Sequence, residues 1–231
     1  MKLKCRKGKK SRKRMNINIA DRKEGVAASL AAKAAQADIA TMGHYTEFGF
    51  MDPEIKFMCG RDAKVVGNAL TVRIPAEESK SLHLAVSMVQ EGDVVVIDRC
   101  GDRNHAAVGE MVALCANTRK AAAIIIDGSM TDFEEIREIG IPVFARGISA
   151  LTTKFVHDCG EINYDISCGG VPVHPGDMIM ADRNGILVLR DFEAEELLDT
   201  AIADQKQEFG EKNQVLNGAT LQQLYVPEYP L

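Results

Sequence analysis

Residues 93–127 decide the fold, and they read DVVVIDRCGDRNHAAVGEMVALCANTRKAAAIIID. Two continuous apolar runs, Asp93–Asp98 and 122–127, are typical of strands that are buried on both faces of a sheet. A polar loop and a helical stretch near 106–119 separate the two runs. A strand, a helix and a strand within about 35 residues predict a right-handed parallel crossover. We therefore expect a mixed α/β fold with a parallel βαβ core.

The chain on either side of this core follows simple periodic patterns. The preceding residues predict a helix over 24–40, a strand over 68–75 and a helix over 79–90. The irregular stretch 41–63 between them is expected to be a functional loop or an intersubunit arm. After the core we expect a strand over 141–145, short antiparallel strands over 161–190, and a charged amphipathic helix over 192–213.

The domain organisation follows from charge and composition. Residues 2–14 carry nine Lys or Arg and no acid, although the whole chain has a net charge of −5. We interpret residues 1–15 as a basic disordered leader outside the fold; the alternative is an arm that contacts nucleic acid through phosphate charge alone. Residues 16–214 are expected to form a single domain, and 215–231 an extended C-terminal tail.

Composition excludes several classes of protein. No stretch of about 20 apolar residues could span a membrane, and the basic N-terminus leads into no apolar segment of a secretory signal. The six cysteines form no CxxC pair, which argues against a zinc cluster or a disulfide scaffold. The GxGxxG, P-loop and GxSxG motifs are absent, which argues against the common nucleotide-binding and serine-hydrolase classes. We expect a cytoplasmic protein without nucleic-acid binding apart from its basic arm.

The candidate cleft lies where the two central strands end. In an open α/β sheet, ligands bind outside the carboxyl ends of the strands. The loops that follow Asp98 and Asp127 should therefore lie side by side. Between them they carry six chemically capable side chains: Arg99, Asp102, Arg103, His105, Glu110 and Asp132.

Gly109 begins the first notable motif, Gly109-Glu110-Met111-Val112. If a helix starts at this glycine, its free N–H groups form an anion pocket that a carboxylate can approach closely. The alternative is an earlier helix start, with Gly109 buried for packing and Glu110 in solvent.

Asp132 belongs to the second motif, which reads DGSMTD over 127–132. This aspartate could hold a divalent cation through oxygen ligands and water, as magnesium sites with few carboxylates do. The alternative is a capping box, in which Thr131 is the N-cap residue and Glu134 answers it.

Several motifs together resemble the RraA-like family, which includes the regulator of ribonuclease activity A and the class II 4-hydroxy-4-methyl-2-oxoglutarate aldolases. They cover about residues 30–210 in order and read VVGNALTVRI (65–74), GDVVVID (92–98), GE (109–110), IIIDGSMTD (124–132), IPVFARG (141–147) and CGGVPVHPGDMIMADRNGILVL (168–189). The resemblance implies a three-layer β/β/α, swivelling-domain fold with a β-rich second half. It also implies a homotrimer, or a hexamer of two trimers, with sites at subunit boundaries that a carboxylate such as Glu208 could enter from a neighbour.

The resemblance also assigns roles to the two motifs. The aldolases carry an acidic residue, twenty further residues and then Arg-Asp; here Glu110 is followed by 111–130 and then Thr131-Asp132. Asp132 would bind Mg²⁺ or Mn²⁺, and Glu110 would hold metal-bound water. The backbone amides of Gly109, Glu110, Met111 and Val112 would receive the carboxylate or enolate oxygen of a 2-oxo acid.

Thr131 departs from the family pattern, because it replaces the arginine that would clamp the oxo acid. Threonine cannot supply the charged, bidentate contact of a guanidinium. We hypothesise that Arg99 or Arg103, in the neighbouring loop, supplies the anion contact instead. The alternative is that both arginines are surface residues.

The function that follows is a divalent-metal-dependent lyase. It would perform aldol cleavage or decarboxylation of a small 2-oxo acid through a metal-stabilised enolate, as a 4-hydroxy-4-methyl-2-oxoglutarate aldolase or oxaloacetate decarboxylase does. The substrate is open to change because of Thr131. The alternative is a non-catalytic regulator that binds a ribonuclease or another protein. A third hypothesis keeps the pocket but assigns it other chemistry.

Overall fold

The computed structural model describes residues 16–62 and 64–229. The predicted basic leader, residues 1–15, lies outside the described residues. The helices are α1 (Ala28–Ala34), α2 (Ile39–Met42), α3 (Lys80–Met88), α4 (Glu110–Thr118), α5 (Phe133–Ile139), α6 (Asp191–Leu216) and α7 (Leu221–Tyr225). The strands are β1 (Asn16–Ile19), β2 (Lys56–Cys59), β3 (Val65–Arg73), β4 (Asp93–Asp98), β5 (Ala106–Val108), β6 (Ala123–Ile126), β7 (Ser129–Met130), β8 (Val143–Ala145), β9 (Gly147–Ile148), β10 (Cys159–Ile162), β11 (Ile166–Cys168), β12 (Val171–Val173), β13 (Met178–Asp182) and β14 (Gly185–Leu189).

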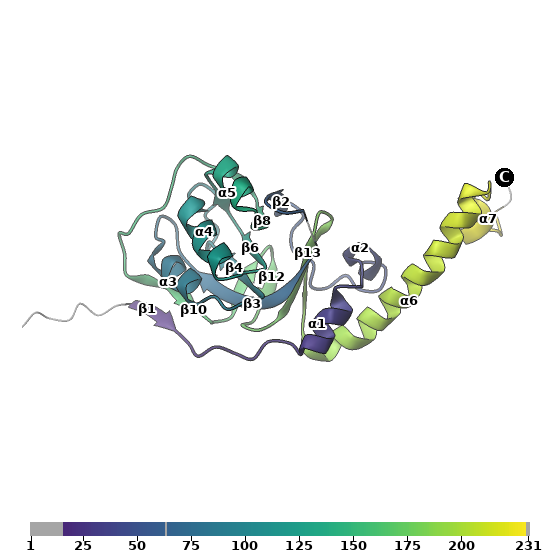
Figure 1. The fold of residues 1–231 in the computed structure, drawn as a ribbon, viewed down its shortest axis with the longest axis horizontal. Helices are drawn as coiled ribbons and strands as arrows, with labels where there is room; N and C mark the ends of the chain where they lie inside the picture. Colours follow the sequence, from purple (N-terminus) through teal and green to yellow (C-terminus); the bar gives the residue numbers. More distant parts are fainter. Residues whose placement is uncertain (1–15, 63, 230–231) are drawn as a thin grey trace, which may run out of the picture.

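A large mixed sheet forms the centre of the molecule (Figure 1). Its strands follow the order β1-β10-β3-β4-β6-β8-β2, and the β13–β14 hairpin joins at β3. The four central strands β3, β4, β6 and β8 are parallel. The predicted parallel pairing of the two apolar runs is therefore confirmed, with β4 on the predicted residues.

The alternation of side chains along β4 creates the layers. Val95 and Ile97 pack in the apolar cluster beneath α3, α4 and α5, whereas Val94 and Val96 pack on the other face with Ile166 of the β11–β12 hairpin. Because both faces are covered, every residue of β4 is buried. Helices, central sheet and hairpin make three layers, which confirms the expected mixed α/β architecture.

The second half of the chain is antiparallel, as predicted, with β11 paired to β12 and β13 to β14. The helix predicted over 24–40 is shorter and is broken into α1 and α2. Long-range hydrogen bonds accompany the break: the Asp38 N–H donates to the Gln205 side chain at 2.8 Å, and Lys64 Nζ donates to the Ala37 carbonyl at 2.7 Å.

The C-terminal segment differs from the extended tail that we expected. Helix α6 continues to Leu216, and the short helix α7 follows because Thr220 and Gln223 form a capping box. The first half of α6 packs on α1 and α2, and its second half projects away from the body as an arm (Figure 1). No helix in the described ranges is both long and apolar enough to cross a bilayer.

The segment that we predicted as a helix near 106–119 begins instead with a strand. Strand β5 pairs in parallel with β7, and β7 pairs in parallel with β9. This small three-stranded sheet follows the carboxyl ends of the central strands. It carries the chain from the sheet into α4 and α5, and so it positions the candidate site.

Candidate functional site

Strands β5 and β7 deliver the two motifs to one place. Their parallel register pairs Val108 with Met130, and the Thr131 N–H donates to the Val108 carbonyl at 2.9 Å. Gly109 thus directly follows β5, and Thr131 directly follows the adjacent parallel strand β7. The juxtaposition that topology predicted for the loops after β4 and β6 is present.

Asp132 makes the central contact of the site. Its Oδ2 atom accepts a hydrogen bond from the Glu110 N–H at 2.9 Å, and Thr131 Oγ1 lies 3.2 Å from its Oδ1 atom. Its backbone is left-handed (φ 51°, ψ 49°), which is uncommon for a residue with a side chain. The carboxylate therefore meets the first N–H of α4, although Asp132 itself precedes α5.

The capping-box interpretation of this motif is wrong. The N-cap residue of α5 is Asp132 rather than Thr131, and no side chain caps this helix. Glu134 pairs with Arg137 in the next turn at 2.5 Å. The strand pairing of β5 with β7 draws the Asp132 carboxylate to α4, a long-range contact that a local pattern does not encode.

The short distance between Asp132 and the start of α4 requires a glycine at position 109. Its backbone is extended (φ −127°, ψ −173°). A Cβ atom at this position would lie 2.7 Å from Asp132 Oδ2 and 3.2 Å from Thr131 Cγ2. Helix α4 starts immediately after the glycine, so the earlier helix start is excluded and the anion-pocket alternative has the right geometry.

The first turn of α4 offers free donors beside the carboxylate. Within the described part of the chain, the N–H groups of Met111 and Val112 donate no hydrogen bond to any acceptor. Glu110 is exposed, and its carboxylate has no hydrogen bond or ion pair with any described residue. Two acidic side chains and two open amides therefore share one exposed surface.

The donor set of this surface suits a hard cation. Asp132 and Glu110 supply only oxygen ligands, the type that Mg²⁺ and Mn²⁺ prefer. The described residues contain no group of three or more His, Cys, Asp or Glu side chains gathered around a common point. A cation here would take the rest of its ligands from water and substrate, as magnesium commonly does.

Arg99 does not face this surface, and our hypothesis that it contacts the substrate is wrong for the folded chain. Its side chain is completely buried, and burial lowers its pKa. The guanidinium donates to the carbonyl groups of Ile74 and Ala76 and to Asp102 Oδ2, the last at 3.1 Å. Arg99 thus ties the loop after β3 to the loop after β4.

Arg103 lies at the other end of the small sheet. Its carbonyl accepts from Ser129 Oγ at 2.6 Å, where β7 begins, whereas Asp132 follows the end of β7. The exposed Arg103 side chain pairs with Glu54 at 3.2 Å. The structure therefore does not bring Arg103 to Asp132, which agrees with the alternative of a surface arginine.

Asp102 and His105 form a pair beside Arg99. His105 Nδ1 lies 2.7 Å from Asp102 Oδ2, and the Asn104 N–H donates to Asp102 Oδ1 at 2.9 Å. Partial burial opposes ionisation, but these hydrogen bonds outweigh it and lower the pKa of Asp102. The pair precedes β5, so it lies at the opposite end of this strand from Gly109.

Sequence reasoning missed Arg146, which joins three acidic side chains. It is almost buried and pairs with Asp127 at 2.5 Å, Asp52 at 2.8 Å and Glu54 at 3.1 Å. Burial alone would lower the pKa of Arg146, but its hydrogen bonds and ion pairs with Asp127 and Asp52 raise it. The sequence could have pointed to Arg146 through its position: it directly follows β8, at the same edge of the sheet as Asp98 and Asp127.

Comparisons with known proteins agree with this architecture. The protein family described as RraA-like (Aldolase/RraA) matches residues 18–188. A putative 4-hydroxy-4-methyl-2-oxoglutarate aldolase from Halalkalibacterium halodurans is 36% identical over 138 residues, which cover 60% of this chain and 65% of that relative. The chain thus spans just under two thirds of that relative's length.

Two solved structures are similar as well. The RNA-processing inhibitor RraA from Thermus thermophilus is 25% identical with a TM-score of 0.59, covering 65% of this chain and 90% of that one. RraAS2 from Streptomyces coelicolor, an unusual member of the RNase ES inhibitor RraA family, shares the fold at 24% identity and a TM-score of 0.73, covering 82% and 98%. With a family match over most of its length and this fold, the chain belongs to the RraA-like family.

Proposed function

We propose that this protein is a divalent-metal-dependent lyase that cleaves or decarboxylates a small 2-oxo acid. The observation that supports the proposal most strongly is the contact between the Asp132 carboxylate and the first N–H of α4, with the Glu110 side chain exposed beside it. This arrangement places a cation ligand next to an anion pocket. A 2-oxo acid needs both, because it carries a carboxylate next to a carbonyl group.

The chain's own groups divide the work in a simple way. Asp132 and Glu110 would hold Mg²⁺ or Mn²⁺, which as a Lewis acid stabilises the negative charge of an enolate. The N–H groups of Met111 and Val112 would bind the substrate carboxylate, helped by the positive end of the α4 dipole. The unpaired Glu110 carboxylate would orient water and exchange protons with it.

Thr131 affects substrate choice rather than cation binding. Its hydroxyl contacts the Asp132 carboxylate, but it provides no positive charge for the substrate. Arg99, buried and hydrogen bonded elsewhere, does not replace that charge. We therefore propose that the substrate is held mainly by the cation and the α4 amides, which favours a compact 2-oxo acid over a large polyanion.

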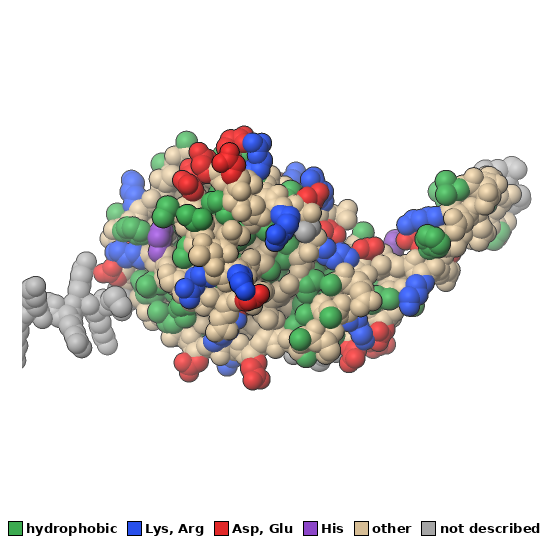
Figure 2. Space-filling model, viewed as in Figure 1, with side chains coloured by type: hydrophobic (Ala, Val, Ile, Leu, Met, Phe, Trp, Pro, Cys, Tyr) green, Lys and Arg blue, Asp and Glu red, His purple; other side chains and the backbone are tan. Residues whose placement is uncertain are grey.

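We also propose that the protein is a cytoplasmic homotrimer, or a hexamer of two trimers. Seven large apolar side chains are exposed on α3, on α4 and in 148–156: Leu84, Met111, Leu114, Ile148, Leu151, Phe155 and Val156. Figure 2 shows hydrophobic side chains grouped on this part of the body. Met111 is next to Glu110, so a second copy on this surface would border the site. The described cysteines are all free, as is usual in a reducing compartment.

The second candidate function is a regulator that binds another protein. The same exposed apolar surface favours it, because surfaces of this kind mark interaction sites. The Thermus relative is an inhibitor of RNA processing, and Thr131 removes the family arginine. We rank this function second because protein binding alone does not require an acidic pair beside the open amides of α4.

Oxaloacetate decarboxylation with Mg²⁺, Mn²⁺ and Co²⁺ distinguishes the two functions. The lyase is expected to need a divalent cation and to lose activity in Asp132→Asn and Glu110→Gln. Glu135→Gln is the matched control, because Glu135 is an exposed acid in the first turn of α5 outside the site. Titration of Mn²⁺ followed by electron paramagnetic resonance tests binding separately. Absence of both binding and turnover with all three cations would reject the lyase.

A further inference from the structure

The loop between β4 and β5 holds a histidine whose two ring nitrogens have different surroundings. His105 Nδ1 lies 2.7 Å from Asp102 Oδ2, whereas its Nε2 atom has no hydrogen-bond partner among the described residues. In residues 16–62 and 64–229, Arg99 Nε is the one buried side-chain nitrogen or oxygen atom without a partner. The unpartnered Nε2 atom of His105 is therefore not buried but open to solvent, and the side chain as a whole is 25% exposed.

The Asp102 carboxylate decides which ring nitrogen of His105 carries the proton. Although partial burial opposes ionisation, hydrogen bonds from Asn104 and His105 lower the pKa of Asp102. An ionised carboxylate only accepts hydrogen bonds, so Nδ1 of the neutral imidazole is the donor. The lone pair of the ring then lies on Nε2, the nitrogen that is open to solvent.

Two arginines give this loop its positive charge. Arg99 Nη2 donates to the same Asp102 oxygen at 3.1 Å, and the Arg99 side chain is completely buried. Its charge offsets that of Asp102, so an anion can approach the imidazole with little repulsion. Arg103 is 60% exposed and pairs with the exposed Glu54 at 3.2 Å. An exposed pair of this kind is weak, so Arg103 can turn to another anion.

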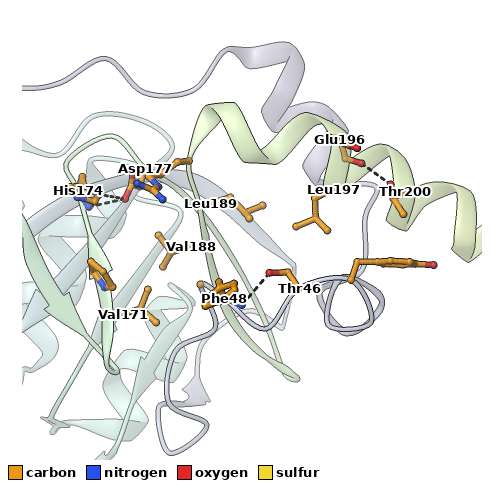
Figure 3. A pocket seen from close by; sticks show the side chains of 14 residues that line it. Thr46, Phe48, Val171, His174, Asp177, Val188, Leu189, Glu196, Leu197 and Thr200 are labelled. Carbon is orange, nitrogen blue, oxygen red and sulfur yellow. Dashed lines mark hydrogen bonds and ion pairs between the residues drawn. The ribbon is translucent and has the colours of Figure 1, made fainter.

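A second histidine–aspartate pair shows what is particular to His105. His174 Nδ1 lies 3.1 Å from Asp177 Oδ2, and the same oxygen accepts the His174 N–H at 2.7 Å, so this pair belongs to a local turn (Figure 3). Among the described residues, no hydrogen bond or ion pair joins an arginine to Asp177. His174 is also more exposed, at 42%. The chain thus contains its own matched control for His105.

We propose that His105 is a nucleophile that accepts a phosphoryl group from a small acyl phosphate. The Nε2 lone pair attacks phosphorus and forms an N–P bond, while the bond from phosphorus to the acyl oxygen breaks and its electron pair leaves with the carboxylate. The Nδ1 proton stays in place, so the ring becomes positively charged and Asp102 stabilises that charge. No further base or co-reactant is needed.

A phosphoryl group suits this loop because it brings negative charge to a place that supplies positive charge. Arginine binds phosphoryl oxygens through charge-assisted hydrogen bonds, and cations stabilise the charge that a phosphoryl group carries during transfer. Arg103 is two residues from His105, and Arg99 shares the Asp102 oxygen with the ring. The proposal does not depend on the lyase function, because His105 precedes β5 and the site at Asp132 lies beyond the other end of this strand.

Acetyl phosphate is the probe for the first experiment. The full chain is incubated with it at neutral pH, and an acid-labile, alkali-stable gain of one phosphoryl group is followed by intact-protein mass and located by electron-transfer fragmentation. We expect His105 to be labelled about tenfold or more faster than His174, because an orienting carboxylate contributes about 10–100-fold for metal-bound histidines. Equal labelling of the two histidines, labelling confined to other residues, or none would overturn the proposal.

The second experiment tests the orienting carboxylate. Asp102→Asn keeps the size of the side chain and should slow the labelling of His105 about tenfold or more. Asp177→Asn, the same change in the control pair, should leave it unaltered. Circular dichroism checks folding, and a ¹H–¹⁵N correlation spectrum of the wild-type histidines shows directly which nitrogen carries the proton. A proton on Nε2 of His105, or unchanged labelling in the folded Asp102→Asn variant, would also overturn the proposal.

Discussion

Gly109→Ala adds one methyl group where the site has no room for it. The new Cβ atom would lie 2.7 Å from Asp132 Oδ2, closer than non-bonded carbon and oxygen atoms approach. Because the Gly109 backbone is extended, alanine adopts it without strain, and the clash itself is the only perturbation. The Asp132 carboxylate must move away by about 0.8 Å, because a relaxed van der Waals contact needs a separation near 3.5 Å.

The displacement breaks the hydrogen bond from the Glu110 N–H to Asp132. A hydrogen bond to a charged group contributes about 1.5–3 kcal/mol, which corresponds to a loss of roughly 10- to 150-fold in cation affinity or kcat/KM. Alanine is a slightly poorer N-cap residue than glycine, at a cost of about 1 kcal/mol or less. Together the broken hydrogen bond and the poorer N-cap cost the folded state about 2–4 kcal/mol, so the thermal midpoint should fall by roughly 4–16 °C.

Calorimetric titration of Mn²⁺ measures the loss of cation affinity, and the steady-state kinetics of oxaloacetate decarboxylation measure the loss of kcat/KM. Differential scanning calorimetry measures the fall in the thermal midpoint. Gly147→Ala is the matched control: Gly147 lies in β9 of the same small sheet, and a Cβ atom there meets nothing within 4 Å. The control should bind Mn²⁺ like the wild type. If Gly109→Ala binds Mn²⁺ and turns over as the wild type does, Asp132 is not the cation ligand.

Three further predictions follow from the same geometry. Thr131→Arg supplies a bidentate donor beside Asp132 and should lower the KM for a 2-oxo acid about thirtyfold or more, which corresponds to the lower end of the ~2–5 kcal/mol of a charged contact. An unchanged KM would mean that the substrate carboxylate lies elsewhere. Arg99→Met leaves Asp102 without its buried cation and should lower the free energy of unfolding by about 3–5 kcal/mol, which urea denaturation measures. A change of less than about 1 kcal/mol would contradict a structural role for Arg99. Hydrogen bonds from Asn104 and His105 lower the folded-state pKa of Asp102. The ionised Asp102 therefore stabilises the fold above its unfolded-state pKa near 4, and this stabilisation is lost as the pH falls through the lower folded-state pKa. In Asp102→Asn the free energy of unfolding should accordingly fall less steeply with decreasing pH, and an unaltered pH profile would argue against this contribution.

Several elements follow directly from local pattern. The apolar runs of β4 and β6 mark strands buried on both faces, and their parallel pairing places the loops after them together. Such patterns are readable because side-chain periodicity and turn residues are local properties of the chain. The candidate pair Glu110 and Asp132 was predicted on this basis, with the resemblance to the RraA-like family assigning their roles.

Other elements depended on partners distant in sequence. Thr131 and Glu134 satisfy a capping-box pattern, yet the Asp132 carboxylate meets α4 because β5 and β7 pair. Arg99 belongs by pattern to a polar loop, yet it is completely buried because carbonyl groups after β3 accept hydrogen bonds from its guanidinium. Each of these outcomes depends on a neighbour that no sequence window contains.

The amino-acid sequence by itself determined the parallel α/β core, the hairpins of the second half and the two acidic motifs, because burial and turn geometry are encoded over a few residues. Tertiary structure alone decided which groups the charged side chains contact and where the C-terminal arm goes. The physical reason is that a hydrogen bond or an ion pair forms with the nearest available partner in space. At Asp132 that partner is the first N–H of α4, twenty-two residues away in the sequence.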